Sequence, residues 1–532
     1  MVRIFLAILS ALLLTLSFPN FDLGFLVWVG LVPFFLAIRY KSLGKVLGLS
    51  YLTGVGFFLG VFYWINAIKA VTLLQYSILG LYLGLYLVVF GFFFYFISSK
   101  FRFLSLIPAL PLWVAVEYLR SHAGFAALPM GHLGFTQHQN LSLIQMASFT
   151  GVYGVSFVIV MVNVAIADLI GYWIDRKRQK GPDYSPSPSS LSPQGRGKFF
   201  EKPILAGVIV LTMILILCVG GHISLPPTPS GKSLSVAVVQ GNIPQELKWK
   251  REYREQIISK YEALSEEASR FHPQIIVWPE ASTPGFILKD IILYQRMVSM
   301  VRRINTYLLA GSAEYPKFGK RPIKLKSGNT ALFFSPEGKV LGQYLKIRLT
   351  PFGEYVPYEG VFPWPEFLVS KETNSNLAGT EPILFEVDGT KFGTLICSEI
   401  LYPELGRCMV EKGAGFLVNI NNEAWFGKSA YSYQALSIAI FRAVENRVNL
   451  VRSNNTGVSG FIDPYGRVTA RLTKGGEDLF IEGTLTHEIF LSPAGTFYTR
   501  YGDVFAYGCI AFSIGLMIWS FFRKSQRIKT KK

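Results

Sequence analysis

The 532-residue sequence is poor in charge, in acidic residues and in cysteine. Charged residues make up 16% of the chain, against roughly 25% in ordinary soluble domains. Four cysteines are too few for a disulfide framework, and 51% hydrophobic residues exclude disorder of the chain as a whole. With a mean hydropathy of +0.36, much of the chain is expected to lie in lipid.

The net charge of +18 is concentrated in the apolar part of the chain. Residues 232–500 hold 31 basic and 27 acidic residues, so the remainder holds 21 basic and only 7 acidic ones. A nucleic-acid-binding protein would instead gather its basic residues on a folded domain, with aromatic residues between them. We therefore expect no nucleic-acid partner.

Apolar runs long enough to approach a membrane span recur along the chain. Eight candidates are present, at about 4–18, 24–38, 51–71, 76–97, 105–119, 148–174, 204–223 and 504–522. With the N-terminus in the cytoplasm, the inside segments carry 19 Lys and Arg residues and the short outside loops carry 2, as the positive-inside rule requires. A signal peptide is the alternative for the first run, but Ser17–Asn20 is a poor cleavage site.

These runs predict three regions. Residues 1–231 form a membrane domain of seven helices, which includes a Ser/Pro-rich cytoplasmic loop at 176–203. Residues 232–495 form a soluble domain outside the cytoplasm. Residues 496–532 form a final membrane helix and a basic cytoplasmic tail. Both termini are then cytoplasmic.

The soluble region alternates strand-like and helix-like segments. The predicted strands are the short apolar stretches 233–243, 275–280, 307–315, 330–335, 391–399, 415–422 and 448–455. The predicted helices are 250–271, 290–305, 403–412 and 431–446. This alternation indicates an α/β sandwich, in which the ends of strands carry the chemistry.

Three strand ends in this region carry polar residues that together make a nucleophilic set. Glu280 ends one strand, Cys397 ends another, and Lys346 lies in the segment YLKIRLTPFGEYVP. A carboxylate can take the thiol proton, and a lysine can stabilise the oxyanion that follows attack by the thiolate. Only two histidines lie in residues 232–500, neither in a promising setting, which disfavours a Cys–His protease.

Each of these residues also has a structural interpretation. A cysteine at the end of an apolar strand is commonly a small core residue, and Cys397 has a possible disulfide partner in Cys408. Most Lys and Glu side chains in such a domain are solvated. The combination, rather than any one residue, favours catalysis.

The set resembles the Glu-Lys-Cys triad of the nitrilase, or carbon–nitrogen hydrolase, superfamily. More narrowly, the sequence resembles the apolipoprotein N-acyltransferases, the membrane branch of that superfamily. The similar stretches are VVQGNIPQELKW (238–249), WPE (278–280), YLKIRLTPFGEYVP (344–357), ICSE (396–399), NNEAWFG (421–427) and RAVENRVNLVRSNNTGVSGFIDPYG (442–466). The resemblance implies about eight membrane helices and an α-β-β-α sandwich catalytic domain.

The resemblance also implies roles for individual residues. Glu280 would be the general base, Cys397 the nucleophile and Lys346 the oxyanion stabiliser. The implied supporting and substrate-binding residues are Glu354, Glu399, Trp249, Ser398 and Asn422. Two positions depart from the family pattern, since Ser398 replaces an aromatic residue and Glu423 replaces an aspartate.

The implied activity is acyl transfer through a thioester on Cys397. The donor would be a membrane phospholipid, and the acceptor would be the α-amine of a diacylglyceryl-modified cysteine at the N-terminus of a lipoprotein. No metal or organic cofactor is implied. The location would be the bacterial inner membrane, with the catalytic domain in the periplasm. The alternatives are a membrane-tethered amidase or nitrilase that uses the same triad on water, and a non-catalytic scaffold or transporter.

Overall fold

The computed structural model divides into two compact units. It describes residues 1–98, 105–179, 202–226, 231–315, 327–369, 376–491 and 495–529. The helical unit comprises Met1–Tyr63, Tyr76–Ser224 and Asp503–Lys532, and the second unit comprises Trp64–Gln75 and Leu225–Gly502. Most of the predicted Ser/Pro-rich loop, residues 180–201, lies outside the described residues.

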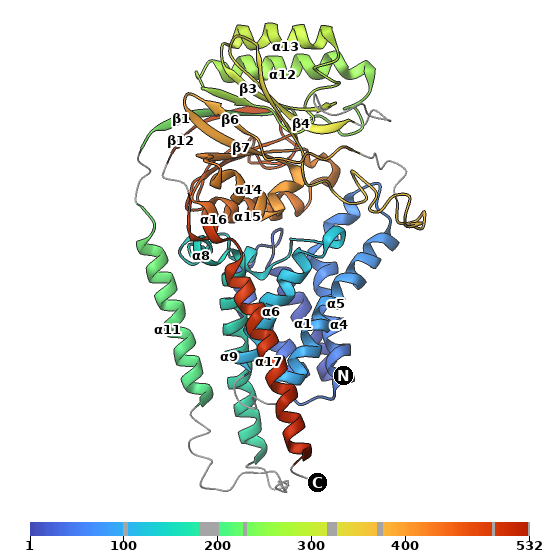
Figure 1. Cartoon of the computed structure of the whole chain (residues 1–532), viewed down its shortest axis with the longest axis vertical. Helices are drawn as coiled ribbons and strands as arrows, with labels where there is room; N and C mark the ends of the chain where they lie inside the picture. Colours follow the sequence, from blue (N-terminus) through green and yellow to red (C-terminus); the bar gives the residue numbers. More distant parts are fainter. Residues whose placement is uncertain are drawn as a thin grey trace. The chain divides into compact units, whose positions relative to one another are not determined.

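The helical unit consists of apolar helices (Figure 1). Its helices are α1 (Val2–Leu16), α2 (Val27–Gly30), α3 (Val32–Ile38), α4 (Leu43–Val61), α5 (Leu73–Ser98), α6 (Leu106–Ser121), α7 (Leu141–Ile144), α8 (Ala147–Thr150), α9 (Val152–Gln179), α11 (Lys202–Ile223) and α17 (Val504–Lys529). Within the described residues, α4, α5, α9 and α11 are long and apolar enough to cross a membrane, and shorter apolar helices include α1 and the apolar part of α17, Val504–Ser520.

The second predicted span is broken rather than continuous. A 3-10 turn at Gly24–Leu26 is followed by α2 and then α3, with Pro33 in the first turn of α3. Because proline has no N–H, a continuous helix would leave a carbonyl of the preceding turn without its donor. Asn163 of α9 bonds both sides of the break, accepting from Leu31 N at 2.8 Å and donating to Val27 O at 2.8 Å.

The third predicted span, 51–71, is wrong in its position. The helix α4 starts eight residues earlier, at Leu43, and ends at Val61. Tyr63–Ala67 forms a 3-10 turn, in which the Trp64 side chain is buried and donates from Nε1 to Gln434 Oε1 at 3.1 Å. Hydropathy alone extends the predicted span over residues 62–71, whereas Trp64 packs against Phe426 and Tyr431 within the second unit.

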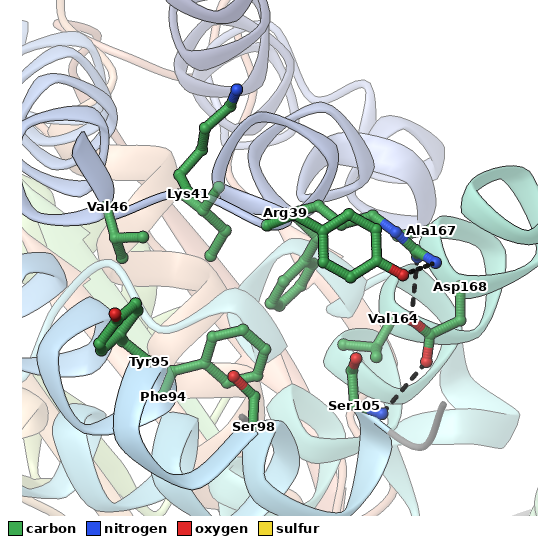
Figure 2. A pocket seen from close by; sticks show the side chains of 13 residues that line it. Arg39, Lys41, Val46, Phe94, Tyr95, Ser98, Ser105, Val164, Ala167 and Asp168 are labelled. Atoms are coloured by element: carbon green, nitrogen blue, oxygen red, sulfur yellow. Dashed lines mark hydrogen bonds and ion pairs between the residues drawn. The ribbon is translucent and has the colours of Figure 1, made fainter. Parts of the chain in front are cut away.

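A cavity of about 320 Å³ lies in the helical unit (Figure 2). Its walls are apolar and aromatic, with contributions from Phe35 and Phe94. Arg39 forms an ion pair with Asp168 at 3.6 Å, and Asp168 also accepts from Ser105 N at 3.2 Å. None of the predicted triad residues lines this cavity.

The second unit contains two six-stranded sheets with the same kind of strand arrangement. The first has the order β12-β1-β2-β3-β4-β5, and the second has the order β11-β10-β9-β8-β7-β6. The first sheet is made of β1 (Ser233–Gln240), β2 (Ile275–Val277), β3 (Tyr307–Glu314), β4 (Gly328–Phe334), β5 (Val340–Leu345) and β12 (Gly483–Phe490). The second is made of β6 (Leu384–Val387), β7 (Thr390–Ile396), β8 (Phe416–Asn421), β9 (Asn449–Asn454), β10 (Gly460–Ile462) and β11 (Val468–Arg471).

Each sheet has three parallel strands joined by crossover helices. The strands β1, β2 and β3 are parallel, as are β7, β8 and β9. The crossover helices are α12 (Arg254–Ser269), α13 (Ile291–Ile304), α14 (Pro403–Glu411) and α15 (Tyr431–Asn446). Because α12 and α13 cover the first sheet and α14 and α15 the second, the unit is a four-layer α-β-β-α sandwich (Figure 1).

Alternating apolar residues explain this layering. Ile257 and Tyr261 of α12 and Met297 of α13 form one core with Ile276 of β2. Between the sheets, Phe333 of β4 lies with its ring centroid 5.3 Å from that of Phe392 of β7. The α-β-β-α sandwich that the resemblance implied is therefore confirmed.

Candidate active site

The predicted triad residues follow strands that end at corresponding edges of the two sheets. Glu280 follows β2 by three residues, and Cys397 directly follows β7. Lys346 directly follows β5, which runs in the same direction as the parallel strands because β4 between them is antiparallel. The fold thus gathers three residues that are far apart in sequence.

Glu280 is held by hydrogen bonds to both carboxylate oxygens. Oε2 accepts from Asn422 N at 2.7 Å, and Oε1 accepts from Asn329 Nδ2 at 2.5 Å. The side chain is 7% exposed. Gly311 of β3 allows this packing, since a Cβ there would lie 2.2 Å from the Pro279 carbonyl oxygen. The carboxylate is therefore fixed in orientation and shielded from water.

Cys397 occupies a sharp turn between β7 and a 3-10 helix, Cys397–Leu401. Its φ of 53° lies in the left-handed region, which non-glycine residues rarely adopt and which often marks functional sites. Burial, the Glu280 charge and a hydrogen bond to Glu280 raise the pKa of the thiol well above its ordinary value, whereas the charge of Lys346 lowers it. Ionisation of this thiol therefore requires a base and a cation, and Glu280 and Lys346 are both beside it.

Lys346 is 1% exposed and forms an ion pair with Glu354, with 2.7 Å between Nζ and Oε2. Burial alone lowers the pKa of Lys346, but the charges of Glu354, Cys397 and Glu280 outweigh it and raise the pKa above the ordinary value. Burial likewise opposes ionisation of Glu354, but the ion pair lowers the pKa of this carboxyl. Lys346 is therefore a permanent cation beside the thiol.

Glu399 joins the nucleophile turn to the loop that carries Lys346. This fully buried carboxylate accepts from Ile396 N at 2.8 Å on one side and from Ile347 N at 2.6 Å on the other. It also accepts from Tyr344 Oη at 2.9 Å. Glu399 thus fixes the distance between Cys397 and Lys346 through the backbone.

Ser398 and Glu423, the two departures from the family pattern, both have partners. Ser398 Oγ lies 3.0 Å from Thr350 Oγ1, which makes a second link between the nucleophile turn and the loop 344–357. Glu423 is buried in an ion pair with Arg452 at 2.8 Å. Burial raises the pKa of Glu423, and the charge of Arg452 opposes the rise.

Asn422 and Trp249 differ in their relation to the triad. The backbone of Asn422 binds the Glu280 carboxylate, and its side chain donates to Gln245 Oε1 at 2.7 Å. Trp249 is instead 52% exposed, so its ring does not pack into the triad. Cys397 and Cys408 are both free cysteines, which excludes the disulfide alternative in this structure.

One buried residue beside Glu280 was not predicted from the sequence. Lys248, beside Trp249, is 1% exposed and donates from Nζ to the Glu280 carbonyl oxygen at 3.0 Å. The segment QELKWK contains two lysines, and hydropathy does not distinguish the buried one. The available signal was the position of Lys248 and Trp249 in the stretch 238–249, one of those that resemble the family.

Comparisons with known proteins show the family to which the chain belongs. The Carbon-nitrogen hydrolase family model matches residues 235–495, and the Apolipoprotein N-acyltransferase N-terminal domain matches residues 10–165. The Apolipoprotein N-acyltransferase of Geobacter metallireducens is 35% identical over 528 residues, which cover 98% of this chain and 95% of that protein. The chain belongs to the apolipoprotein N-acyltransferase family.

A second family member, the Apolipoprotein N-acyltransferase of Bradyrhizobium diazoefficiens, is 29% identical over 78% of this chain and 73% of its own length. Among solved structures, an amidase of the nitrilase superfamily from Nesterenkonia AN1 is 16% identical. It covers 53% of this chain and 98% of its own, with a TM-score of 0.38. Family membership in the acyltransferases therefore rests on relatives that match nearly the whole chain.

Proposed function

We propose that this acyltransferase moves an acyl chain from a membrane phospholipid to the N-terminal amine of a lipoprotein. The observation that carries the proposal is the convergence of Glu280, Lys346 and Cys397 in a chain with an N-acyltransferase N-terminal domain. A covalent intermediate divides the exchange of an ester for an amide into two easier steps.

In the first step, Glu280 takes the proton of the Cys397 thiol, and the thiolate attacks the ester carbonyl carbon of the phospholipid. Lys346 stabilises the tetrahedral oxyanion. Collapse of this intermediate breaks the ester C–O bond, and the protonated Glu280 returns the proton to the departing alkoxide. The products are a thioester on Cys397 and a lysophospholipid.

In the second step, the α-amine of the diacylglyceryl-cysteine attacks the thioester carbonyl. Glu280 accepts a proton from the attacking nitrogen, and Lys346 again stabilises the oxyanion. Breakage of the C–S bond releases the amide product and the Cys397 thiolate, which recovers its proton from Glu280. Thioesters are readily attacked by amines, so the intermediate suits this acceptor.

The predicted domain boundaries and topology belong to this proposal. Residues 1–231 and 496–532 would hold the catalytic domain, 232–495, at the periplasmic face of the bacterial inner membrane. Both lipid substrates would then be reached from that face, with the two termini in the cytoplasm. Reporter fusions to each terminus and to the segment 232–240 test the arrangement, and a cytoplasmic signal from 232–240 would contradict it.

The membrane-tethered amidase alternative uses the same triad but ends in hydrolysis. The relatives that match 98% and 78% of the chain both bear the acyltransferase name, which disfavours this alternative. The non-catalytic alternative leaves the base, cation and thiol at one site without a purpose.

Intact-protein mass spectrometry tests the proposed intermediate. After incubation with phospholipid, the full-length protein in detergent should gain one acyl mass, which hydroxylamine removes. Cys397→Ala should gain none, whereas Cys408→Ala, a matched control at a free cysteine elsewhere in the same unit, should behave as the unaltered protein. An adduct that persists in Cys397→Ala would place the nucleophile elsewhere.

A further inference from the structure

Lys248 is a buried cation that the mechanism above does not use. An ammonium group has three N–H donors, and within the described residues its one hydrogen bond goes to the Glu280 carbonyl oxygen at 3.0 Å. No carboxylate forms an ion pair with it in the described part of the chain. Burying a charge without a partner is unfavourable, so such a group is commonly retained for function.

The Lys248 hydrogen bond falls at a strained point of the backbone. The acceptor carbonyl belongs to Glu280, and the next residue, Ala281, has a φ of 45° in the left-handed region. Lys248 therefore anchors the peptide group on which the orientation of the proposed base depends. Its neighbour in the same loop, Gln245, reaches the other side of Glu280 through the side chain of Asn422.

The charge of Lys248 also acts on the reacting groups. Glu280 and Cys397 both interact electrostatically with its ammonium. The thiol is also influenced by Lys346 and Glu354. Lys346 is already paired with Glu354, so Lys248 is a second cation that acts on Glu280 and Cys397, both before and after the proton moves between them.

We propose that Lys248 is a positioning residue that holds Glu280 and supplies the second positive charge needed to form the Cys397 thiolate. This inference rests on the triad roles proposed above. Lys346 is paired with Glu354, so without Lys248 the negative charge shared by Glu280 and Cys397 would have no cation of its own. A thiol in such a buried site resists ionisation.

The two lysines differ in how they respond to pH. Burial lowers the pKa of Lys248 to about 8, against the opposing charges of Glu280 and Cys397. The ammonium is thus present below pH 8 and is progressively lost above it. Since Lys346 stays protonated throughout this range, thiolate stabilisation should weaken as the pH rises through about 8, and Lys248 alone accounts for the loss.

Alkylation of Cys397 by iodoacetamide tests this role without any lipid. The full-length protein in detergent is alkylated from pH 6 to 9, and the modified peptide containing Cys397 is quantified by mass spectrometry. Lys248→Met should slow alkylation about tenfold at pH 7, as expected when the thiol pKa rises by one. Its rate profile should move to higher pH. Lys250→Met, at the exposed lysine two residues on, is the matched control and should follow the unaltered protein.

Two results would overturn the proposal. One is a Lys248→Met profile that superimposes on that of the unaltered protein. The other is an equal loss of rate at every pH, which is the mark of a structural role alone. Should Lys248→Met fail to fold, the unaltered protein still decides, because its rate of acylation by phospholipid should fall between pH 8 and 9. A rate that keeps rising there would contradict the inference.

Two measurements, acylation by phospholipid and alkylation by iodoacetamide, separate this inference from the proposed function. Absence of an acyl-enzyme in the unaltered protein refutes phospholipid acylation. The alkylation profiles still report on Lys248 in that case, since they require only the thiol and its neighbours.

Discussion

Two loops of the second unit, 241–250 and 344–357, each bring one fully buried lysine to the same thiol. In the loop 344–357, Lys346 is paired with a carboxylate of its own loop, Glu354. In the loop 241–250, Lys248 has a backbone carbonyl as its partner. One loop therefore supplies a permanent charge and the other a charge that depends on pH. Burial alone does not define a charged side chain's role; its partner does.

The largest expected effect comes from removing the Cys397 thiol, on which both lysines act. Cys397→Ala should abolish acyl transfer, because Cys397 is the thiol that lies beside Glu280 and Lys346. Acyl transfer to a diacylglyceryl-cysteine peptide measures this directly. Retention of more than a trace of activity would make the comparison of the two loops irrelevant to catalysis.

Lys346→Met should lower the acylation rate about 10²–10³-fold, the usual loss when an oxyanion stabiliser is removed. The loss should be similar from pH 6 to 9, since Lys346 does not titrate there. Rapid-quench measurement of acyl-enzyme formation across this range checks both statements. A loss confined to high pH would reverse the roles assigned to the two loops.

The two substitutions should have opposite effects on stability. Lys346→Met strands the largely buried Glu354 carboxylate and should destabilise the fold by about 3–5 kcal/mol. Lys248→Met removes a buried charge whose lowered pKa means that the fold disfavours it, so the variant should be as stable as the unaltered protein or more stable, even though it slows the chemistry.

The direction in which the stability contribution of Lys248 changes with pH follows from the lowered pKa of its ammonium. The folded protein gives up this proton near pH 8, whereas the unfolded chain keeps it to about pH 10.4. The unfavourable contribution of Lys248 is therefore present in full below pH 8 and disappears as the pH approaches 10. Thermal unfolding at pH 7 and pH 9.5 should give a larger difference between Lys248→Met and the unaltered protein at pH 7. A larger difference at pH 9.5 would contradict the assignment.

Glu399→Gln tests the backbone link between the nucleophile turn and the loop 344–357. An amide retains one acceptor oxygen, so it cannot accept from Ile396 N and Ile347 N on separate oxygens. We expect a loss of about 1–3 kcal/mol in the free energy of unfolding and a fall in kcat with little change in KM. An unchanged kcat would mean that the position of Lys346 does not depend on this carboxylate.

Ser398→Ala should have the smallest effect. It removes the hydrogen bond to Thr350, while the Glu399 contacts that join the same two segments remain. A change of about 1 kcal/mol or less in the free energy of unfolding is expected. Steady-state rates should stay within about fivefold, the largest change that about 1 kcal/mol permits. A fall as large as that of Glu399→Gln would make the serine an equal partner in the link.

In the second unit, the sequence predicted those strands and helices whose pattern lies in neighbouring residues. Short apolar stretches ending in Glu280 and Cys397 marked β2 and β7, because buried parallel strands read as continuous apolar runs. Five strands were missed, β5, β6, β10, β11 and β12. Four of them are the edge strands of the two sheets, where polar and apolar residues mix, and β10 has only three residues. The resemblance, rather than the pattern, supplied Glu399.

The features that the sequence did not predict depend on contacts between segments that are far apart in the chain. Lys248 becomes a buried cation only when the loop 241–250 closes on Glu280, 32 residues away in sequence. In the helical unit, hydropathy could not reveal that Asn163 would bond across the break between α2 and α3. Nor could it show that Trp64 packs against Tyr431 rather than continuing a helix.

The central claim concerns the fate of the acyl group carried by Cys397. The most direct measurement is a single turnover in which the purified acyl-enzyme receives a diacylglyceryl-cysteine peptide and the products are identified by mass spectrometry. The account predicts that the protein loses the acyl mass as the peptide gains it in a hydroxylamine-resistant amide. Release of the acyl group as free fatty acid, at the same rate with and without peptide, would contradict acyl transfer and identify a hydrolase.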